Sequence, residues 1–237
     1  MDALQSKRIA LLSEHIPDTV SRVFENLGYG CVSLPSFSEL DAPVAAHPDM
    51  LFFKIEDKKL LCDQRYYKEN AALLSSIDVE FVFSKAVVSG QYPNDIAFDV
   101  FSFDGVLYGK LDFIAPEIRQ SFKNAVNVKQ GYTKCSTLLT DRCAITADQG
   151  IYARLKENGV NVIKISPSGI SLPGYGAGFI GGASAYDHQN DTVVFFGDLS
   201  VHPDCDMIRS FLIENGHKII SVSDRPLTDY GGAILIN

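Results

Sequence analysis

The sequence lacks any apolar stretch long enough to cross a membrane as a helix. Such a helix needs about 20 consecutive, predominantly apolar residues, and the apolar runs of this chain are much shorter. The run 9–12, close to the N-terminus, is also too short to form the core of a signal peptide. We therefore expect a cytosolic protein with no membrane partner.

Basic residues are few and scattered. The chain has 21 Lys and Arg against 29 Asp and Glu, a formal net charge of −8. Its densest basic cluster, residues 54–59, also contains Glu56 and Asp57. Proteins that bind nucleic acid through their surface use clustered basic side chains, so we expect no nucleic-acid partner. A homodimer is the candidate assembly.

The cysteines form neither a metal-binding nor a disulfide pattern. Their number is odd and no two are spaced as CxxC, which argues against structural zinc and against a disulfide framework. They are Cys31, Cys62, Cys135, Cys143 and Cys205. Most of them lie in apolar stretches, where a small buried thiol is common. We expect no metal and no other cofactor.

The chain repeats one pattern five times: a β-type run, a short helix with an apolar stripe, a second β-type run, a loop and a third β-type run. The two clearest copies, residues 155–165 and 212–222, both begin Leu-x-Glu-Asn-Gly. Such a repeat indicates a closed array of units, in which equivalent loops converge on one axis. The units span roughly residues 8–53, 59–100, 106–139, 143–184 and 193–237. No linker separates two halves, so we predict a single domain over residues 1–237.

Apolar spacing predicts one helix in each unit. In the first unit, Val20, Val23, Phe24 and Leu27 follow the i, i+3, i+4, i+7 pattern, and Gly28 ends the helix. The predicted helices begin near residues 18, 66, 116, 148 and 204, and the second extends to about residue 76. In the third unit, Ile118, Phe122 and Ala125 should face inward, and Asp204 should cap the last helix. The predicted third β-type runs are 50–53, 96–98, 135–139, 179–180 and 231–236.

An ordinary doubly wound α/β sheet is the alternative, because strands that alternate with helices are its usual signature. A dinucleotide-binding loop must open a helix, whereas the Gly-rich stretch 174–178 follows a proline and precedes a β-type run. This alternative predicts a helix that starts directly at 178–182. The glycines of 174–182 indicate either a flexible lid or a segment that closely approaches another backbone.

Polar stretches occupy equivalent positions in the five units. They are His47-Pro48-Asp49, Asn94-Asp95, Gly131-Tyr132-Thr133-Lys134-Cys135, Gly181-Gly182-Ala183-Ser184 and Asp229-Tyr230-Gly231-Gly232-Ala233. An array of five ββαβ-type units with such stretches resembles the pentein, or guanidino-group-modifying-enzyme, superfamily, and in particular an uncharacterised bacterial branch of it. That family includes arginine and agmatine deiminases, dimethylarginine hydrolases, amidinotransferases and a non-catalytic, ribosome-binding translation factor.

The resemblance implies a pseudo-fivefold α/β propeller with an axial pocket. It also implies a Cys-dependent hydrolase or deiminase that attacks the carbon of a small guanidino or amide compound, with a His for proton transfer and carboxylates that hold the cation. Cys135 is then the nucleophile and His47 the acid/base, and Asp49 or Asp95 is the orienting carboxylate. The residues expected to contact substrate are Asn94, Asp95, Lys134, Ser184 and Asp229.

Cys135 is also the best nucleophile from the residues alone. It follows a loop and neighbours the cation Lys134, which would lower the pKa of the thiol. A packed strand cysteine is the alternative for Cys135, and a turn residue is the alternative for His47.

The sequence departs from the pentein enzymes in its last unit. There the enzymes carry the nucleophilic Cys, whereas this chain has none in the equivalent stretch, so Cys135 would serve only if the units were cyclically shifted. Lys134 stands where a His often precedes that Cys, and Ala183 and Ala233 replace the aspartate of Gly-Gly-Asp. These departures leave a second hypothesis open: a non-catalytic binding module, like the translation factor.

Overall fold

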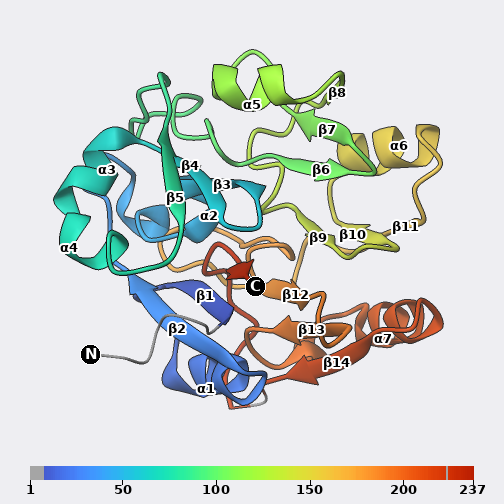
Figure 1. The fold of residues 1–237 in the computed structure, drawn as a ribbon. Coiled ribbons are helices and arrows are strands. Elements are labelled where there is room, and N and C mark those ends of the chain that lie inside the picture. Colours follow the sequence, from blue (N-terminus) through green and yellow to red (C-terminus); the bar gives the residue numbers. More distant parts are fainter. Residues whose placement is uncertain (1–7, 223) are drawn as a thin grey trace.

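Five three-stranded sheets surround a central axis in the computed structural model, which describes residues 8–222 and 224–237 (Figure 1). In each sheet the middle strand pairs antiparallel with one neighbour and parallel with the other. In sheet order the strands are β15 (Ile234–Ile236), β1 (Arg8–Ser13) and β2 (Tyr29–Leu34); β3 (Phe52–Glu56), β4 (Lys59–Cys62) and β5 (Glu80–Phe83); β6 (Phe101–Phe103), β7 (Val106–Gly109) and β8 (Asn124–Asn127); β9 (Thr137–Leu139), β10 (Ala144–Thr146) and β11 (Val162–Lys164); β12 (Ser184–Asp187), β13 (Thr192–Phe195) and β14 (Lys218–Ser221).

Helices on the outside connect the middle strand of each sheet to its parallel neighbour (Figure 1). They are α1 (Asp18–Asn26), α3 (Gln64–Glu69) with α4 (Ala71–Leu74), α5 (Pro116–Ser121), α6 (Gln149–Glu157) and α7 (Cys205–Glu214). The short helix α2 (Pro48–Leu51) and the 3-10 turns η1 (Ala42–Val44) and η2 (Leu199–Val201) lie in loops. None of the helices in the described residues is long and apolar enough to cross a membrane.

The C-terminal strand closes the array. Strand β15 pairs antiparallel with β1, with Ile9 opposite Ile236 and Leu11 opposite Ile234. The third strand of each repeat likewise joins the sheet of the next repeat, as β3 does with β4. The predicted pseudo-fivefold α/β array is confirmed, and each sheet takes its strands from two successive repeats.

The two clearest copies of the repeat end their helices in the same way. The carbonyl oxygens of Leu155 and Leu212 each accept a hydrogen bond at 3.0 Å from the N–H five residues further on. Gly159 and Gly216 take φ values of +76° and +80°, a left-handed conformation that glycine adopts without strain. The repeated Asn-Gly pairs are therefore helix stops, as the sequence predicts.

The predicted third strands begin too early in the chain. Residues 96–98 and 179–180 form turns, and strands β6 and β12 begin a few residues later. The run 50–53 is divided between α2 and β3. Most of the residues that precede the strands are buried, so their apolar character reflects packing and not strand formation.

The predicted helix boundaries need similar corrections. The helix expected over 66–76 is interrupted at Asn70, whose side-chain amide donates to the Tyr66 carbonyl oxygen. Helix α5 ends at Ser121, so Phe122 follows it and Ala125 belongs to β8. Asp204 makes no side-chain bond to its own helix and instead accepts from the N–H of Ser166.

The Gly-rich stretch is packed at its C-terminal end. No helix begins at 178–182, which rules out the prediction of the doubly wound alternative. A Cβ on Gly181 would lie 2.7 Å from the carbonyl oxygen of Cys135, and one on Gly182 would overlap the carboxylate of Asp229. The close-approach interpretation therefore holds for 178–182, whereas Gly176 has open space around it.

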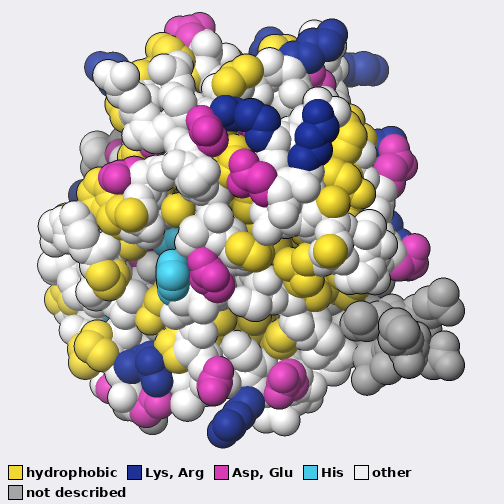
Figure 2. All heavy atoms as spheres, turned by 90° about the vertical axis from the view of Figure 1, so that its left-hand side faces the viewer, with side chains coloured by type: hydrophobic (Ala, Val, Ile, Leu, Met, Phe, Trp, Pro, Cys, Tyr) yellow, Lys and Arg dark blue, Asp and Glu magenta, His cyan; other side chains and the backbone are white. Residues whose placement is uncertain are grey.

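Charged side chains of both signs share the surface. On the face seen in Figure 2, basic and acidic side chains are interspersed among apolar ones, without one continuous basic area.

Candidate active site

Side chains from four axial loops meet near the centre of the array. Asp49 comes from α2, Asp99 from the turn before β6, Cys135 from the turn before β9 and Asp229 from the loop before β15. All four are buried. The fifth loop, before β12, contributes Gly182, which leaves room for the Asp229 carboxylate.

Two carboxylates hold Cys135, one through its thiol and the other through its backbone. Its Sγ donates to Oδ2 of Asp49 at 2.8 Å. Asp99 Oδ1 accepts from the backbone N–H groups of Lys134, at 2.6 Å, and Cys135, at 3.1 Å. Asp99 therefore fixes the backbone that carries the thiol, and Asp49 fixes the thiol itself.

His47 lies on the same side of the array as Cys135. Its Nδ1 is 3.8 Å from Oδ1 of Asp229, and Asp229 accepts from the N–H groups of Phe179 and Gly231, each at 2.9 Å. Gly231 has φ +77°, and a Cβ there would overlap the His47 side chain. The backbone next to Asp229 therefore admits the imidazole only because residue 231 is glycine.

Three potential ligand atoms converge at this point. One atom each from His47, Asp49 and Cys135 lie within 4.8 Å of one another. Among the described residues, Nδ1 of His47 and Oδ1 of Asp49 have no hydrogen-bond partner although both are buried. The three side chains are thus close enough to hold one metal ion, a site that the sequence did not predict.

Burial controls the protonation of the thiol and the imidazole. It raises the pKa of Cys135 well above its usual range, and the charges of Asp49 and Asp99 act in the same direction. The expectation that Lys134 lowers this pKa is therefore wrong. Burial also lowers the pKa of His47 to about 3. At neutral pH the unliganded site contains a thiol and a neutral imidazole.

The three carboxyl groups are perturbed as well. Burial raises the pKa of Asp99 to about 7 and that of Asp229 to about 6. Burial, and then the charge of Asp99, raise the pKa of Asp49 well above its usual range. Such a cluster favours a bound cation, because a positive charge would stabilise the ionised carboxylates.

Two cavities lie next to this cluster. The smaller, about 150 Å³, is lined by Cys135, His47 and Asp229 together with Val44, Met50, Tyr132, Leu172, Tyr175, Gly176, Ala177 and Phe179. The larger, about 310 Å³, is lined by residues of all five inner strands, β3, β6, β9, β12 and β15, and by Asp49 and Lys134. The bond between Asp49 and Cys135 thus joins residues that line different cavities.

Three of the other residues expected to contact substrate, Asn94, Asp95 and Ser184, lie outside both cavities. Asn94 is exposed in a turn. Asp95 is buried and accepts from the hydroxyl of Tyr132 at 2.6 Å. Ser184 is buried and donates to the carbonyl oxygen of Ile180. Lys134 lines the larger cavity, away from the space beside the thiol.

Sequence reasoning missed Asp99. It occupies the equivalent loop of the second unit, where Asn94 and Asp95 were expected to act. A signal was present, since Asp99 is the one charged residue in the apolar run 96–101. A charge in such a run is rarely buried unless it is bonded, and here it accepts two backbone N–H groups.

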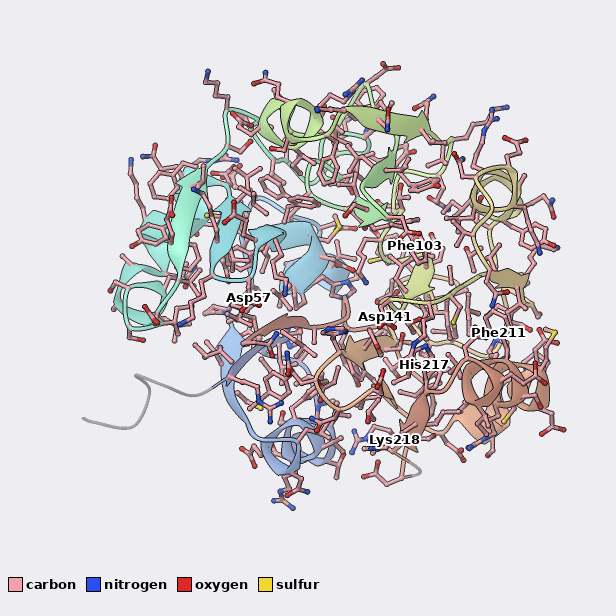
Figure 3. The ribbon with its side chains drawn as sticks, turned by 45° about the vertical axis from the view of Figure 1, so that its right-hand side comes forward. Asp57, Phe103, Asp141, Phe211, His217 and Lys218 are labelled. Atoms are coloured by element: carbon pink, nitrogen blue, oxygen red, sulfur yellow. The ribbon has the colours of Figure 1, made fainter. Side chains whose placement is uncertain are left out.

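A second group of titratable side chains joins the sheet of β9–β11 to the neighbouring sheet of β12–β14. Asp141 and His217 lie near each other in Figure 3, and with Asp191 they form a set of potential ligands. The guanidinium of Arg142 already pairs with both carboxylates, and the Tyr186 hydroxyl donates to them as well. Arg142 therefore occupies the cation position of this group.

A family model matches residues 11–234, nearly the whole chain. The chain belongs to DUF6873, a family of unknown function. No curated protein matches the sequence.

Solved structures of dimethylarginine dimethylaminohydrolase share the fold. An adduct of that enzyme with 4-chloro-2-hydroxymethylpyridine aligns with a TM-score of 0.57 at 10% identity, over 92% of this chain and 93% of the other. The adduct of a variant with S-methyl-L-thiocitrulline gives the same values. The Pseudomonas aeruginosa enzyme with bound citrulline aligns with a TM-score of 0.56 at 10% identity, over 90% of this chain and 91% of the other. The resemblance to the pentein superfamily is confirmed at the level of the fold.

Proposed function

We propose that this protein is a thiol-dependent hydrolase of a small guanidino or amide compound, with Cys135 as the nucleophile. The observation that carries the proposal is the hydrogen bond of 2.8 Å from Cys135 Sγ to Asp49 Oδ2, next to a cavity that Cys135 itself lines. A nucleophile needs a base within hydrogen-bond reach, and Asp49 meets that requirement.

A cationic substrate would activate the thiol. The site is rich in carboxyl groups, and burial together with Asp49 and Asp99 keeps Cys135 protonated when no cation is present. A guanidinium in the smaller cavity brings a positive charge next to Sγ and lowers the pKa of the thiol. The nucleophile then forms where the substrate is bound, which limits side reactions of the free thiol.

The reaction follows from these positions. The Sγ proton passes to Asp49 Oδ2 while sulfur bonds to the guanidinium carbon. That proton goes to the leaving nitrogen as the C–N bond breaks, which releases ammonia or an amine. His47, neutral at physiological pH, then takes a proton from a water molecule that adds to the same carbon. The C–S bond breaks as the proton on His47 returns to sulfur. The product leaves as a protonated urea, and its extra proton passes to the released ammonia or amine in solution.

A covalent probe tests the nucleophile. Dimethylarginine dimethylaminohydrolase, which shares the fold, forms an adduct with 4-chloro-2-hydroxymethylpyridine. We therefore expect this reagent to modify Cys135, and peptide mass spectrometry would identify the modified residue. Release of ammonia or amine from a panel of alkylguanidines and amides should disappear in Cys135→Ser. Cys143→Ser is the matched control, since Cys143 is equally buried but lines neither cavity. Turnover that survives in Cys135→Ser would overturn the proposed role.

A non-catalytic binding module is the second candidate. The protonated state of Cys135 in the unliganded site and the alanines at 183 and 233 favour it. Such a module would bind a guanidinium compound in the same cavity without releasing ammonia or amine and without forming the pyridine adduct. The two candidates therefore differ in covalent chemistry and not in ligand binding.

A further inference from the structure

The lining of the smaller cavity is largely apolar except for three polar side chains. We call these three, Cys135, His47 and Asp229, its floor, and the other lining residues its wall. The wall consists of Val44, Met50, Tyr132, Leu172, Tyr175, Gly176, Ala177 and Phe179. A bound molecule would therefore place its reacting group at the floor and its substituent against hydrocarbon and aromatic surface.

The two tyrosine hydroxyls of this wall are already engaged. Tyr132 donates to Oδ2 of Asp95 and Tyr175 donates to Oδ2 of Asp41, both at 2.6 Å. The proton of each hydroxyl is thus committed to a carboxylate. The ring of Tyr132 packs next to that of Phe179, with centroids 6.2 Å apart. The tyrosines accordingly present their rings, and not a hydrogen-bond donor, to the cavity.

No cation lines this cavity in the part of the chain that the structure describes. Lys134 lines the larger cavity instead, and His47 is neutral at physiological pH. The charges behind the wall are the carboxylates Asp41 and Asp95, which hold the tyrosines. A substrate carboxylate would therefore lose its hydration without gaining a partner, next to groups of like charge.

We propose that the substrate is a small guanidine or amidine that carries one positive charge, a short apolar substituent and no carboxylate. The cavity of about 150 Å³ matches the size of an engineered cavity known to hold one benzene molecule. It accommodates the guanidinium and a substituent of a few carbons. The reaction rests on the proposed hydrolase function, but the preference among ligands rests only on the walls and charges of the cavity.

Three ligands of graded chemistry test this preference. Propylguanidine has the apolar substituent, 4-guanidinobutyramide extends it with a neutral amide, and 4-guanidinobutyrate has the same size as the amide but a negative charge. Binding is measured by calorimetry on Cys135→Ser, which cannot form the covalent intermediate, and turnover is measured on the unmodified protein. We expect the amide to bind about tenfold or more tightly than the carboxylate, and propylguanidine at least as tightly as the amide.

A variant makes the charge argument more specific. Ala177 lines the cavity and is exposed, so Ala177→Arg adds a cation to the wall with little strain. It should reduce the discrimination against 4-guanidinobutyrate several-fold, whereas Ser200→Arg, exposed and outside both cavities, should leave it unchanged.

The two proposals fail in different ways. Equal binding of the amide and the carboxylate, or no binding of any of the three ligands, overturns the proposed ligand class. The expected order of binding without turnover supports the ligand class and contradicts the hydrolase.

Discussion

The pH dependence of stability is the sharpest quantitative consequence of the buried carboxyl cluster. Burial raises the pKa of Asp229 from 3.8 to about 6. Two pKa units, at about 1.4 kcal/mol each, correspond to about 3 kcal/mol of folding free energy. Because the pKa of Asp229 is higher in the folded state, its contribution to the free energy of unfolding is greatest below pH 3.8, where the carboxyl is protonated in both states. This contribution is lost as the pH rises through about 6.

Replacement of Asp229 by asparagine removes this titration. Between pH 4 and pH 7.5, Asp229→Asn should therefore lose about 2.5 kcal/mol less stability than the unmodified protein. The variant also deprives one of two backbone donors, Phe179 or Gly231, of its acceptor, which costs about 1–3 kcal/mol. That cost is the same at every pH, so it lowers the whole curve without changing its slope.

Urea denaturation followed by circular dichroism, repeated across this pH range, measures the difference. Asp206→Asn, which removes an exposed carboxylate on α7, is the control for a general effect of charge. A variant Asp229→Asn whose stability falls as steeply with pH as that of the unmodified protein would refute the reasoning, because Asp229 would then not be held protonated by burial.

Three further predictions concern the same region. Gly182→Ala should destabilise the fold by about 3 kcal/mol or more, since its Cβ would overlap the Asp229 carboxylate; an unchanged melting temperature would contradict this. Tyr175→Phe removes the bond to Asp41, worth about 0.5–1 kcal/mol at this exposed position. It should speed alkylation of Cys135 about two- to fivefold if the segment 174–177 controls access, and an equal rate would exclude that role. Alkylation of Cys135 in the unliganded protein should be slow at pH 7 and rise with pH to above 9, because burial and neighbouring carboxylates raise the pKa of its thiol; a rate that levels off below pH 7 would show a thiolate instead.

Much of the candidate site could be predicted from the repeat. The five equivalent stretches named His47, Asp49, Cys135 and Asp229, which the fold brings together. These four residues meet because loops at equivalent positions of a closed array must converge on its axis. Asn94 and Ser184 do not reach this centre. Strand β6, which follows Asn94, begins later than the apolar pattern suggests, and Ser184 is itself the first residue of β12.

The sequence by itself determined the local structure. Apolar residues at helical spacing and Asn-Gly stops are short-range signals, and they define the helices and the fivefold order of units. The tertiary structure alone decided the chemistry of the centre. Burial and charges that meet from distant parts of the chain keep Cys135 protonated, although Lys134 is its neighbour in sequence. Burial and charges act through space, so adjacency along the chain could not reveal that burial, and then Asp49, Asp99 and Asp229, raise the pKa of this thiol.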